Sequence, residues 1–506
     1  MEASPASAGP TRRRRSEADG TATTTSESAP LLSRQLVDIP GSYGLPILGA
    51  IADRLDYYWF QGPAKFFRSR MEKYGGSTVF RTNMPPGPFI STDSRVVALL
   101  DAETFQVLFD CNKVEKGNVF TGTFVPYPAL TGGYRVLSYL DPSEPSHTKL
   151  KLFVLSLLRS RHGNFVPEFS CAVRELFDEL ESVLASGRKA GFNAPCERAS
   201  FKFLCRAFLG RDPANGGIGN DGPALIQKWI LVQLAPDLSL GLPKPLEELL
   251  LRTFRLPPCL VKNDYKRLVD FFRAAGGPAL DEAERLGISR DEALHNLIFL
   301  ICFNSWGGLK VLLPCIIKWI AGAGPEIHRE LAREVRSSGA ATSVGLNPAV
   351  LERLPLLNSA IYEVLRIEPP LPLQYGRAKR DLVLESHRAR YKVRAGEMLC
   401  GYQPLATRDP LVFENSDSYV ANRFVGEEGE RLLKYVVWSN GQETAEPTER
   451  NKQCPGKDLV MLVARIMVAE LFLRYDSLEV EATDEYMGDS VTITSLRPAS
   501  PSVAVR

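Results

Sequence analysis

Apolar positions recur with a helical period over most of the chain. From Ile39 onward, four stretches carry apolar residues three and four positions apart, as one helix face requires: Ser143–Arg159, Val166–Leu184, Pro223–Leu234 and Val261–Phe272. Short strand candidates lie between turn signals, at Ser77–Asn83, Pro88–Thr92, Leu382–Glu385, Leu478–Val480 and Ser490–Ile493. The pattern therefore predicts a mainly α fold with small β-sheets, in the α+β class.

The strongest predicted helix begins after Ser289. Ser289 and Glu292 form an S-x-x-E capping box ahead of an apolar run that continues through Leu297–Ile320. Gly307-Gly308 interrupts this run, and each glycine costs roughly 1 kcal/mol relative to alanine in a helix interior. We therefore expect a ligand or another backbone close to this pair.

No stretch is apolar for long enough to predict a transmembrane helix. The longest uninterrupted run, Leu297–Phe303, has seven residues, whereas a spanning helix needs about 18 or more. The start of the chain also lacks the apolar core of a secretory signal peptide. We expect a soluble protein or, at most, one that associates peripherally with a membrane surface.

The amino-terminal segment, residues 1–38, shows no periodicity. It is rich in Ser and Thr and contains the basic run Arg12–Arg15, which is typical of a disordered extension. Its composition resembles a plastid (chloroplast) transit peptide, although acidic residues are more frequent than in such peptides; a solvated tail on a cytosolic protein is the alternative. Residues 39–506 show no repeat and no second boundary, so we expect one large catalytic domain there.

Composition excludes several classes of function. The chain has 61 Lys+Arg against 59 Asp+Glu, and this near-balance gives no electrostatic case for a nucleic-acid partner. The nine cysteines form no C-x-x-C pair and the five histidines no H-E-x-x-H, which argues against a disulfide framework and structural zinc. Gly217, Gly219 and Gly222 spell G-x-G-x-x-G, but no strand precedes them, so they predict a loop and not a dinucleotide site.

One cysteine has a setting that suits a metal ligand. Cys454 lies between a loop rich in Asn, Pro and Gly and an apolar helix predicted over Leu459–Tyr475. The N–H groups at the start of that helix can point at the sulfur and stabilise its thiolate, the form that binds metal. A loop thiolate followed by a long buried helix is one way in which proteins hold haem iron.

Three motifs in a fixed order then carry a family resemblance. They are the pair Glu363/Arg366 in an E-x-x-R arrangement, Arg423-Phe424, and Cys454 with Gly456. From Ile39 to its end, the chain resembles the cytochrome P-450 superfamily and, within it, the plant group that metabolises fatty acid hydroperoxides. This resemblance implies the P-450 fold as a single haem domain, with haem b as the cofactor and Cys454 as its axial thiolate ligand.

Departures from ordinary monooxygenases specify the subgroup. Gly441 and Cys454 are thirteen positions apart, whereas the corresponding glycine and cysteine of monooxygenases are four positions apart. The loop therefore carries an insertion around Gln442–Arg450. The central helix reads Phe303-Asn304-Ser305-Trp306-Gly307-Gly308, without the acid–alcohol pair that delivers protons to bound dioxygen. The resemblance therefore implies an enzyme that needs neither O2, NADPH nor a reductase, because its oxygen arrives inside a hydroperoxide.

The group contains allene oxide synthases and hydroperoxide lyases. Both break the peroxide O–O bond and form an epoxide with a neighbouring allylic radical; a synthase oxidises this radical and completes a dehydration, whereas a lyase breaks the chain into aldehydes and oxo acids. By resemblance, Asn304 would hydrogen-bond the hydroperoxide. Phe120 would face the carbon radical and stabilise it with its π-system, which favours the synthase.

We therefore expect a hydroperoxide dehydratase acting on the 13- or 9-hydroperoxides of linolenic and linoleic acid, in oxylipin and jasmonate biosynthesis. A hydroperoxide lyase is the alternative. The resemblance also implies cations near the haem propionates, at Lys116, His147, Lys151 and Lys452. His147 and Lys151 are four apart on a predicted helix and should share a face. Lys310 would reach toward the substrate or haem. Trp306, Pro455 and Tyr127-Pro128 depart from the group's usual residues.

Overall fold

A computed structural model describes residues 35–239, 241–338, 346–485 and 488–500. The predicted extension therefore lies outside the described residues, except for its last four positions. The helices are α1 (Leu48–Leu55), α2 (Pro63–Lys73), α3 (Ala102–Phe105), α4 (Pro145–Ala185), α5 (Asn193–Leu204), α6 (Gly222–Leu234), α7 (Lys244–Arg252), α8 (Lys262–Ala275), α9 (Gly277–Arg285), α10 (Arg290–Ile298), α11 (Gly307–Gly322), α12 (Gly324–Ser337), α13 (Pro348–Glu352), α14 (Pro355–Ile367), α15 (Gln403–Ala406), α16 (Gly426–Leu432) and α17 (Lys457–Arg474).

The strands form four small sheets. Their bounds are β1 (Leu36–Val37), β2 (Val79–Asn83), β3 (Arg95–Leu99), β4 (Val114–Glu115), β5 (Ala190–Gly191), β6 (Leu373–Ala378), β7 (Leu382–Glu385), β8 (Arg390–Val393), β9 (Met398–Tyr402), β10 (Val437–Trp438), β11 (Gly441–Gln442), β12 (Tyr475–Thr483) and β13 (Ser490–Pro498). The largest sheet has the order β2-β3-β9-β6-β4; the others are β1-β8-β7, β12-β13-β5 and the pair β10-β11. The predicted mainly α class with small sheets is confirmed.

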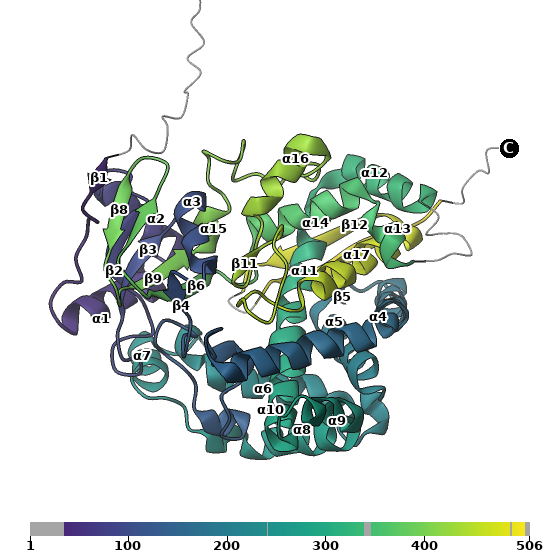
Figure 1. Ribbon diagram of the computed structural model, residues 1–506. Coiled ribbons are helices and arrows are strands. Elements are labelled where there is room, and N and C mark those ends of the chain that lie inside the picture. Colours follow the sequence, from purple (N-terminus) through teal and green to yellow (C-terminus); the bar gives the residue numbers. More distant parts are fainter. Residues whose placement is uncertain (1–34, 240, 339–345, 486–487, 501–506) are drawn as a thin grey trace, which may run out of the picture.

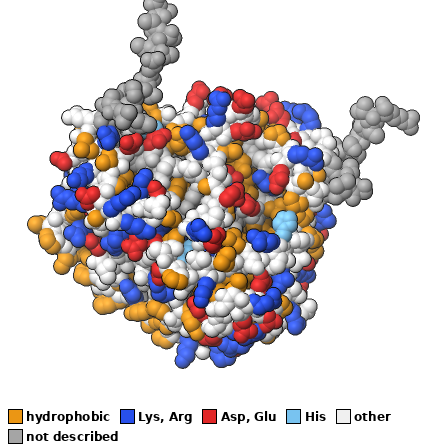
Figure 2. Space-filling model, viewed as in Figure 1, with side chains coloured by type: hydrophobic (Ala, Val, Ile, Leu, Met, Phe, Trp, Pro, Cys, Tyr) orange, Lys and Arg blue, Asp and Glu red, His pale blue; other side chains and the backbone are white. Residues whose placement is uncertain are grey.

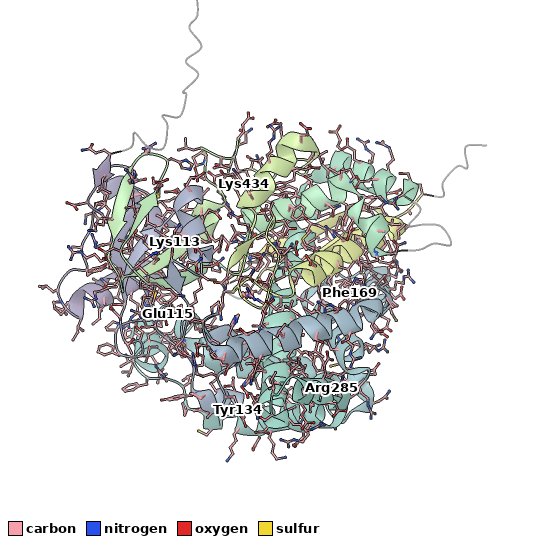
Figure 3. All side chains as sticks on the ribbon, in the orientation of Figure 1. Lys113, Glu115, Tyr134, Phe169, Arg285 and Lys434 are labelled. Atoms are coloured by element: carbon pink, nitrogen blue, oxygen red, sulfur yellow. The ribbon has the colours of Figure 1, made fainter. Side chains whose placement is uncertain are left out.

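The molecule has a sheet-rich part and a larger helical part. In Figure 1 the five-stranded sheet lies on the left with α1 and α2, while α4, α6 and α8–α11 form the helical part below and to the right. The main core lies among the helices. There, Phe169 of α4, labelled in Figure 3, packs edge-to-face on Phe203 of α5 with ring centroids 4.9 Å apart.

Two predicted helices are one. Ser143–Arg159 and Val166–Leu184 belong to the single 41-residue helix α4, which begins at Pro145 and runs through Pro167. The polar stretch between them predicted a break, but the buried face continues across it through Leu157, Phe165 and Phe169. Packing of that continuous apolar face outweighs the hydrogen bond that Pro167 cannot donate. The helices predicted at Pro223–Leu234 and Val261–Phe272 are confirmed as α6 and α8.

One predicted strand is wrong. Pro88–Thr92 forms no strand, and the partner of β2 is instead β3, which begins at Arg95. The carbonyls of Pro86, Gly87 and Pro88 accept hydrogen bonds from Arg54 Nη1 at 3.1–3.4 Å and so face a buried guanidinium. Pro88 has no N–H to donate to a ladder. The other strand predictions are confirmed within β2, β7, β12 and β13.

The long central helix has the predicted start and a local irregularity. Ser289 Oγ accepts a hydrogen bond from the Glu292 N–H at 3.2 Å, as the capping box requires. Between α10 and α11 the chain forms a π-helix, Phe299–Trp306, a geometry often found at functional sites. An added Cβ on Gly308 would meet nothing within 4 Å, whereas one on Gly307 would lie 3.4 Å from Ile230 Cδ1. Open space, and no other backbone, therefore adjoins Gly308.

The whole run Arg290–Gly322 is long and apolar enough to cross a membrane by length and composition alone. More than half of its most apolar window is buried inside the fold, where it packs against α5, α8 and α14. Core helices of water-soluble proteins commonly satisfy the same criterion, and this run is the central helix of the core.

Candidate functional site

A tightly packed loop holds Cys454 at the start of α17. The Cys454 N–H donates to the Ser439 carbonyl at 3.0 Å, which ties the cysteine to the β10–β11 turn. An added Cβ on Gly441 would lie 2.4 Å from Gln453 Cδ, so a larger residue there would displace the Gln453 side chain. Burial raises the pKa of the Cys454 thiol, while the backbone N–H of Gly456 and the Lys151 cation act in the opposite direction.

The inserted segment around Gln442–Arg450 is built into the fold. Gln453 Nε2 donates to the carbonyls of Gln442 and Ala445 at 2.7 and 3.0 Å. The Glu443 carboxylate accepts from Tyr362 Oη at 2.9 Å and from Trp438 Nε1. The insertion therefore holds the side chain of Gln453, the residue next to Cys454, and is itself anchored to Tyr362 and Trp438.

The E-x-x-R pair forms a buried network with a second arginine. Glu363 accepts from Arg366 at 2.7 and 2.8 Å and from Arg423 Nε at 2.9 and 3.0 Å. The Arg366 guanidinium also donates to the carbonyls of Thr407, Ser416 and Ser418 at 2.6–3.1 Å. Glu363 and Arg366 are fully buried, so each charge is paired and hydrogen-bonded as a low-dielectric interior requires.

Four basic side chains gather beside this loop: Lys116, His147, Lys151 and Lys452. Lys151 Nζ donates to the carbonyls of Asn451 (3.2 Å) and Gln453, and Lys116 Nζ donates to Asn440 Oδ1. Burial lowers the pKa of Lys116 to about 7, and burial and neighbouring lysines lower the pKa of His147 to about 4. His147 and Lys151 share the buried face of α4, as predicted.

This cluster suits the carboxylates of a haem. Within the described residues none of the three lysines forms an ion pair, and neither ring nitrogen of His147 makes a hydrogen bond of normal geometry. Buried cations without counter-ions are unfavourable. Two propionates beside a Cys454 thiolate would supply both the negative charge and the missing acceptors, so the residues present fit the group.

The turn at residues 137–140 joins several candidate residues. Lys452 Nζ donates to the carbonyls of Leu137 (2.9 Å), Ser138 (3.0 Å) and Leu140. Asn304, on the π-helix, places its Nδ2 3.5 Å from Ser138 Oγ, at the outer limit of a hydrogen bond. The Asn304 amide is exposed, although half of the residues of its π-helix are buried. It therefore retains donor and acceptor capacity for a ligand.

Phe120 belongs to an aromatic cluster around the same turn. Its ring lies edge-to-face on Tyr139 and Phe303, with centroids 5.7 and 5.9 Å away. Phe303 precedes Asn304 and stacks on Phe299 at 4.5 Å. The structure thus brings Phe120, Asn304 and Lys452 together through residues 137–140.

Lys310 lies apart from this group. Its Nζ forms an ion pair with Glu197 Oε1 of α5 at 2.7 Å and lies 5.5 Å from the Trp306 ring centroid. Trp306 Nε1 donates to the Glu197 carbonyl at 2.9 Å. Both side chains therefore fasten the central helix to α5.

Sequence reasoning did not single out Ser138, Tyr139 or Asn440. Ser138 contacts Asn304 and Asn440 contacts Lys116, and in both pairs the residues are more than a hundred positions apart in the sequence. Tyr139 contacts Phe120, which is nearer in the sequence. One signal was available for Asn440. It adopts φ +60° in the β10–β11 turn, and Ser439-Asn440-Gly441 is a typical sequence for such a hairpin.

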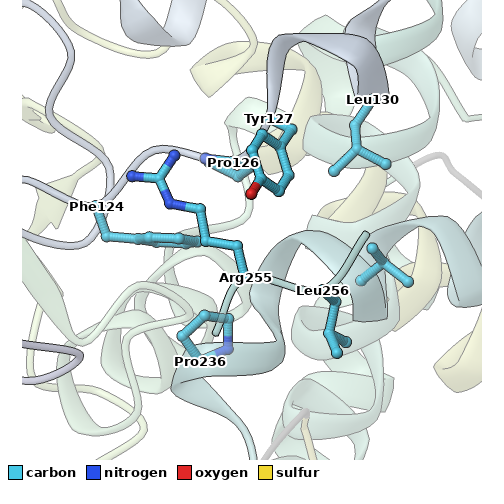
Figure 4. A pocket seen from close by; sticks show the side chains of 8 residues that line it. Phe124, Pro126, Tyr127, Leu130, Pro236, Arg255 and Leu256 are labelled. Atoms are coloured by element: carbon cyan, nitrogen blue, oxygen red, sulfur yellow. The ribbon is translucent and has the colours of Figure 1, made fainter. Parts of the chain in front are cut away.

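A small pocket opens between the segment that follows Phe120 and the segments around α7. Its lining residues, most of which Figure 4 labels, are Phe124, Pro126, Tyr127, Leu130, Val232, Pro236, Arg255 and Leu256. Beside it, Thr121 Oγ1 donates to Asp237 Oδ2 at 2.7 Å. Burial raises the pKa of the Asp237 carboxyl to about 6.

Comparisons with known proteins agree with this geometry. The family model for Cytochrome P450 matches residues 323–501, which include Glu363 and Cys454. An allene oxide synthase from Linum usitatissimum, described as chloroplastic, is 56% identical over 91% of this chain and 85% of its own length. The chloroplastic enzyme of Arabidopsis thaliana is 55% identical over 92% and 89%, and allene oxide synthase 1 of Oryza sativa subsp. japonica 52% over 98% of both chains.

Proposed function

The chain belongs to the allene oxide synthase family of the cytochromes P450, and on that premise we propose that it dehydrates polyunsaturated fatty acid hydroperoxides to allene oxides. The expected substrates are the 13- or 9-hydroperoxides of linolenic and linoleic acid, and the reaction needs neither O2 nor NADPH. The observation that carries the proposal is identity above 50% over more than nine-tenths of the chain. The resemblance inferred from the sequence motifs is confirmed by these relatives.

The candidate residues other than Lys310, which is paired with Glu197, then have roles that the geometry supports. A haem b held by the Cys454 thiolate would supply the one-electron chemistry that breaks the peroxide O–O bond. Positive charge for its propionates would come from Lys116, Lys151 and Lys452, and the neutral imidazole of His147 would offer an N–H donor. The accessible Asn304 amide can donate to one peroxide oxygen and accept from the peroxide proton.

Phe120 is proposed to act after bond cleavage. Its ring is fixed edge-on between Tyr139 and Phe303, so its orientation is set before substrate binds. A π-face beside the allylic carbon stabilises the electron-poor centre that oxidation creates. That stabilisation favours dehydration over chain cleavage.

Product analysis tests the proposal. Purified protein should consume 13- or 9-hydroperoxides without NADPH, and mass spectrometry should detect ketols, the hydrolysis products of allene oxides. Short-chain aldehydes would instead identify a hydroperoxide lyase. Hydroxylation that depends on NADPH and a reductase would contradict both assignments.

The proposed location is the chloroplast, because several relatives are described as chloroplastic.

The surface also supports peripheral attachment to a lipid bilayer. In α7 the charged residues Glu247 and Arg252 are fully buried, whereas Leu249 is 50% exposed. Figure 2 shows apolar side chains along the lower left edge, where α1 and α7 lie in Figure 1. A helix that buries Glu247 and Arg252 and exposes leucines, with Lys244 as an exposed charge at its start, suits the surface of a lipid bilayer.

A further inference from the structure

Arg255 is a cation with unused donors in an apolar setting. Its Nη2 donates to the Ile90 carbonyl at 3.0 Å, and its guanidinium carbon lies 5.4 and 5.5 Å from the ring centroids of Phe124 and Tyr127. No carboxylate in the described part of the chain pairs with it. A guanidinium has five N–H donors, so several remain for a ligand.

The pocket around Arg255 is otherwise apolar. Figure 4 shows the guanidinium reaching over the Phe124 ring, with Tyr127 on one side and Pro236 and Leu256 on the opposite side. The two aromatic faces hold the charge in place and leave its edge free. One fixed cation among apolar side chains matches a ligand that has one anionic end and an apolar chain.

The pocket adjoins the aromatic cluster of the candidate site. Leu130, a lining residue, accepts from Trp229 Nε1 through its carbonyl at 2.8 Å. The Trp229 ring lies edge-on to Phe303 at 6.1 Å, and Phe303 lies edge-on to Phe120 at 5.9 Å. The rings of Trp229 and Phe303 therefore lie between the pocket wall and Phe120.

The other candidate cations are already engaged. Lys310, which the resemblance placed near the substrate, is neutralised by Glu197 at 2.7 Å. Lys452 donates to backbone carbonyls of residues 137–140, and Lys151 donates to the Asn451 carbonyl near Cys454. Among the cations discussed for this site, Arg255 alone combines an apolar pocket with donors that no carboxylate uses.

We propose that Arg255 binds the carboxylate of the fatty acid hydroperoxide and that the apolar wall from Phe124 to Leu130 guides the chain toward Phe120. This inference rests on the proposed function for the identity of the ligand. A carboxylate can accept two N–H bonds from a guanidinium, the strongest geometry for this pair. Arg255 is thus a specificity residue that selects free acids over their esters.

The test compares a free acid with its methyl ester. The wild type should show a KM for the hydroperoxide acid about tenfold below that for the methyl ester. Arg255→Gln should raise the KM for the acid about tenfold, leave kcat and the ester KM nearly unchanged, and so abolish the discrimination. Arg255→Lys should retain part of it, because charge remains and the bidentate geometry is lost.

Lys244→Gln is the matched control, because it removes a neighbouring positive charge that faces the Trp59 ring and not the pocket. It should leave the acid-to-ester ratio unchanged. An Arg255→Gln variant that loses activity equally on acid and ester, or that keeps the wild-type ratio, would overturn the proposal. Loss of binding to anionic phospholipid vesicles with an unchanged ratio would also overturn it, in favour of a lipid headgroup.

Binding without turnover separates this inference from the proposed function. Tryptophan fluorescence can follow the binding of linolenic acid and methyl linolenate, neither of which carries a hydroperoxide. Arg255→Gln should weaken binding of the acid about tenfold and leave binding of the ester unchanged. If the wild type forms no ketols but Arg255→Gln still weakens binding of the acid alone, the proposed function is wrong and the carboxylate site is supported. If ketols form but Arg255→Gln binds the acid as the wild type does, the proposed function is supported and the carboxylate site is wrong.

Discussion

Phe120 is the single side chain on which the reaction outcome should depend most. Phe120→Leu keeps the position apolar and removes the ring that Tyr139 and Phe303 orient. If the ring stabilises the electron-poor carbon by about 1–2 kcal/mol, its loss shifts the product ratio roughly tenfold from ketols toward aldehydes. Haem content and hydroperoxide consumption should persist, and mass spectrometry of the products measures the ratio.

The control for this prediction replaces Phe299, another ring of the same aromatic cluster. Phe299 contacts Tyr139 and Phe303, so Phe299→Leu repacks the neighbours and leaves the ring at 120 in place. It should keep the wild-type ratio. An unmoved ratio in Phe120→Leu would reduce Phe120 to a packing role.

Asn304 should affect turnover far more than cofactor content. Removing the amide in Asn304→Ala costs the hydrogen bonds to the peroxide, about 1.5–3 kcal/mol, and so lowers kcat roughly 10- to 100-fold. Haem absorbance per protein should stay near the wild-type value. Ser138→Ala removes only the weak protein partner at 3.5 Å and should have a much smaller effect. Equal kinetics in Asn304→Ala and the wild type would remove Asn304 from the mechanism.

At the scale of elements, a buried contact fixes the segment that carries Phe120. Thr121 Oγ1 donates to Asp237, which lies on the short helix Ala235–Asp237 between α6 and α7. Burial raises the pKa of Asp237 to about 6, while Thr121, Arg252 and Tyr58 oppose the shift. Ionisation is therefore harder in the folded state than in the unfolded chain, whose Asp pKa is about 3.9.

The sign of the pH effect follows from this shift. The contribution of the protonated Asp237 carboxyl to the stability of the fold is complete below about pH 4. It is lost as the pH rises through about 6. Asp237→Asn has no carboxyl to ionise and does not lose this stability. Between pH 4 and pH 8 its free energy of unfolding should therefore rise by about 2 kcal/mol relative to that of the wild type. Thermal unfolding of both proteins at the two pH values measures it; parallel stability profiles would contradict the assignment.

Sequence alone predicted the elements with a strong period and the residues that belong to motifs. The capping box at Ser289, the helices α6 and α8, and the ligand-type setting of Cys454 are local features, and local patterns reveal them. Failures arose where distant contacts decide. The continuous buried face of α4 outweighs Pro167, and Arg54 binds the carbonyls of Gly87 and Pro88, where the wrongly predicted strand would begin. Arg255 carries no motif, and only its placement beside Phe124 and Tyr127 distinguishes it.

At the scale of the whole molecule, the exposed leucines of α7 predict attachment to a bilayer. Leu249 and Leu250 are 50% and 42% exposed on a helix whose Arg252 is held inside by Glu248 at 3.0 Å. Replacing both leucines with glutamate removes apolar contact and adds charge, and should reduce the vesicle-bound fraction about tenfold. Sedimentation with phospholipid vesicles measures it.

The matched control for vesicle binding is Leu411→Glu. Leu411 is 60% exposed and lies outside α1 and α7, so its replacement should not change binding. Equal binding by the wild type and the α7 variant would mean that these leucines meet another surface. Unfolding of each variant should remain cooperative, because none of the three leucines, Leu249, Leu250 and Leu411, contributes to the buried charge network.

The pairing of β5 with β13 sets the order in which the polypeptide can mature. Ala190 and Gly191 pair with Ile493 and Thr492, and Asn193 at the start of α5 exchanges hydrogen bonds with Asp489 and Val491 at 2.7 and 2.8 Å. Because α5 also carries Glu197, which anchors Lys310 and Trp306, the pairing near the end of the chain supports the helix to which the central helix is fastened. Contacts of such long sequence separation form slowly. We therefore expect the surroundings of the central helix to reach their final packing only after β13 has been synthesised and has paired with β5.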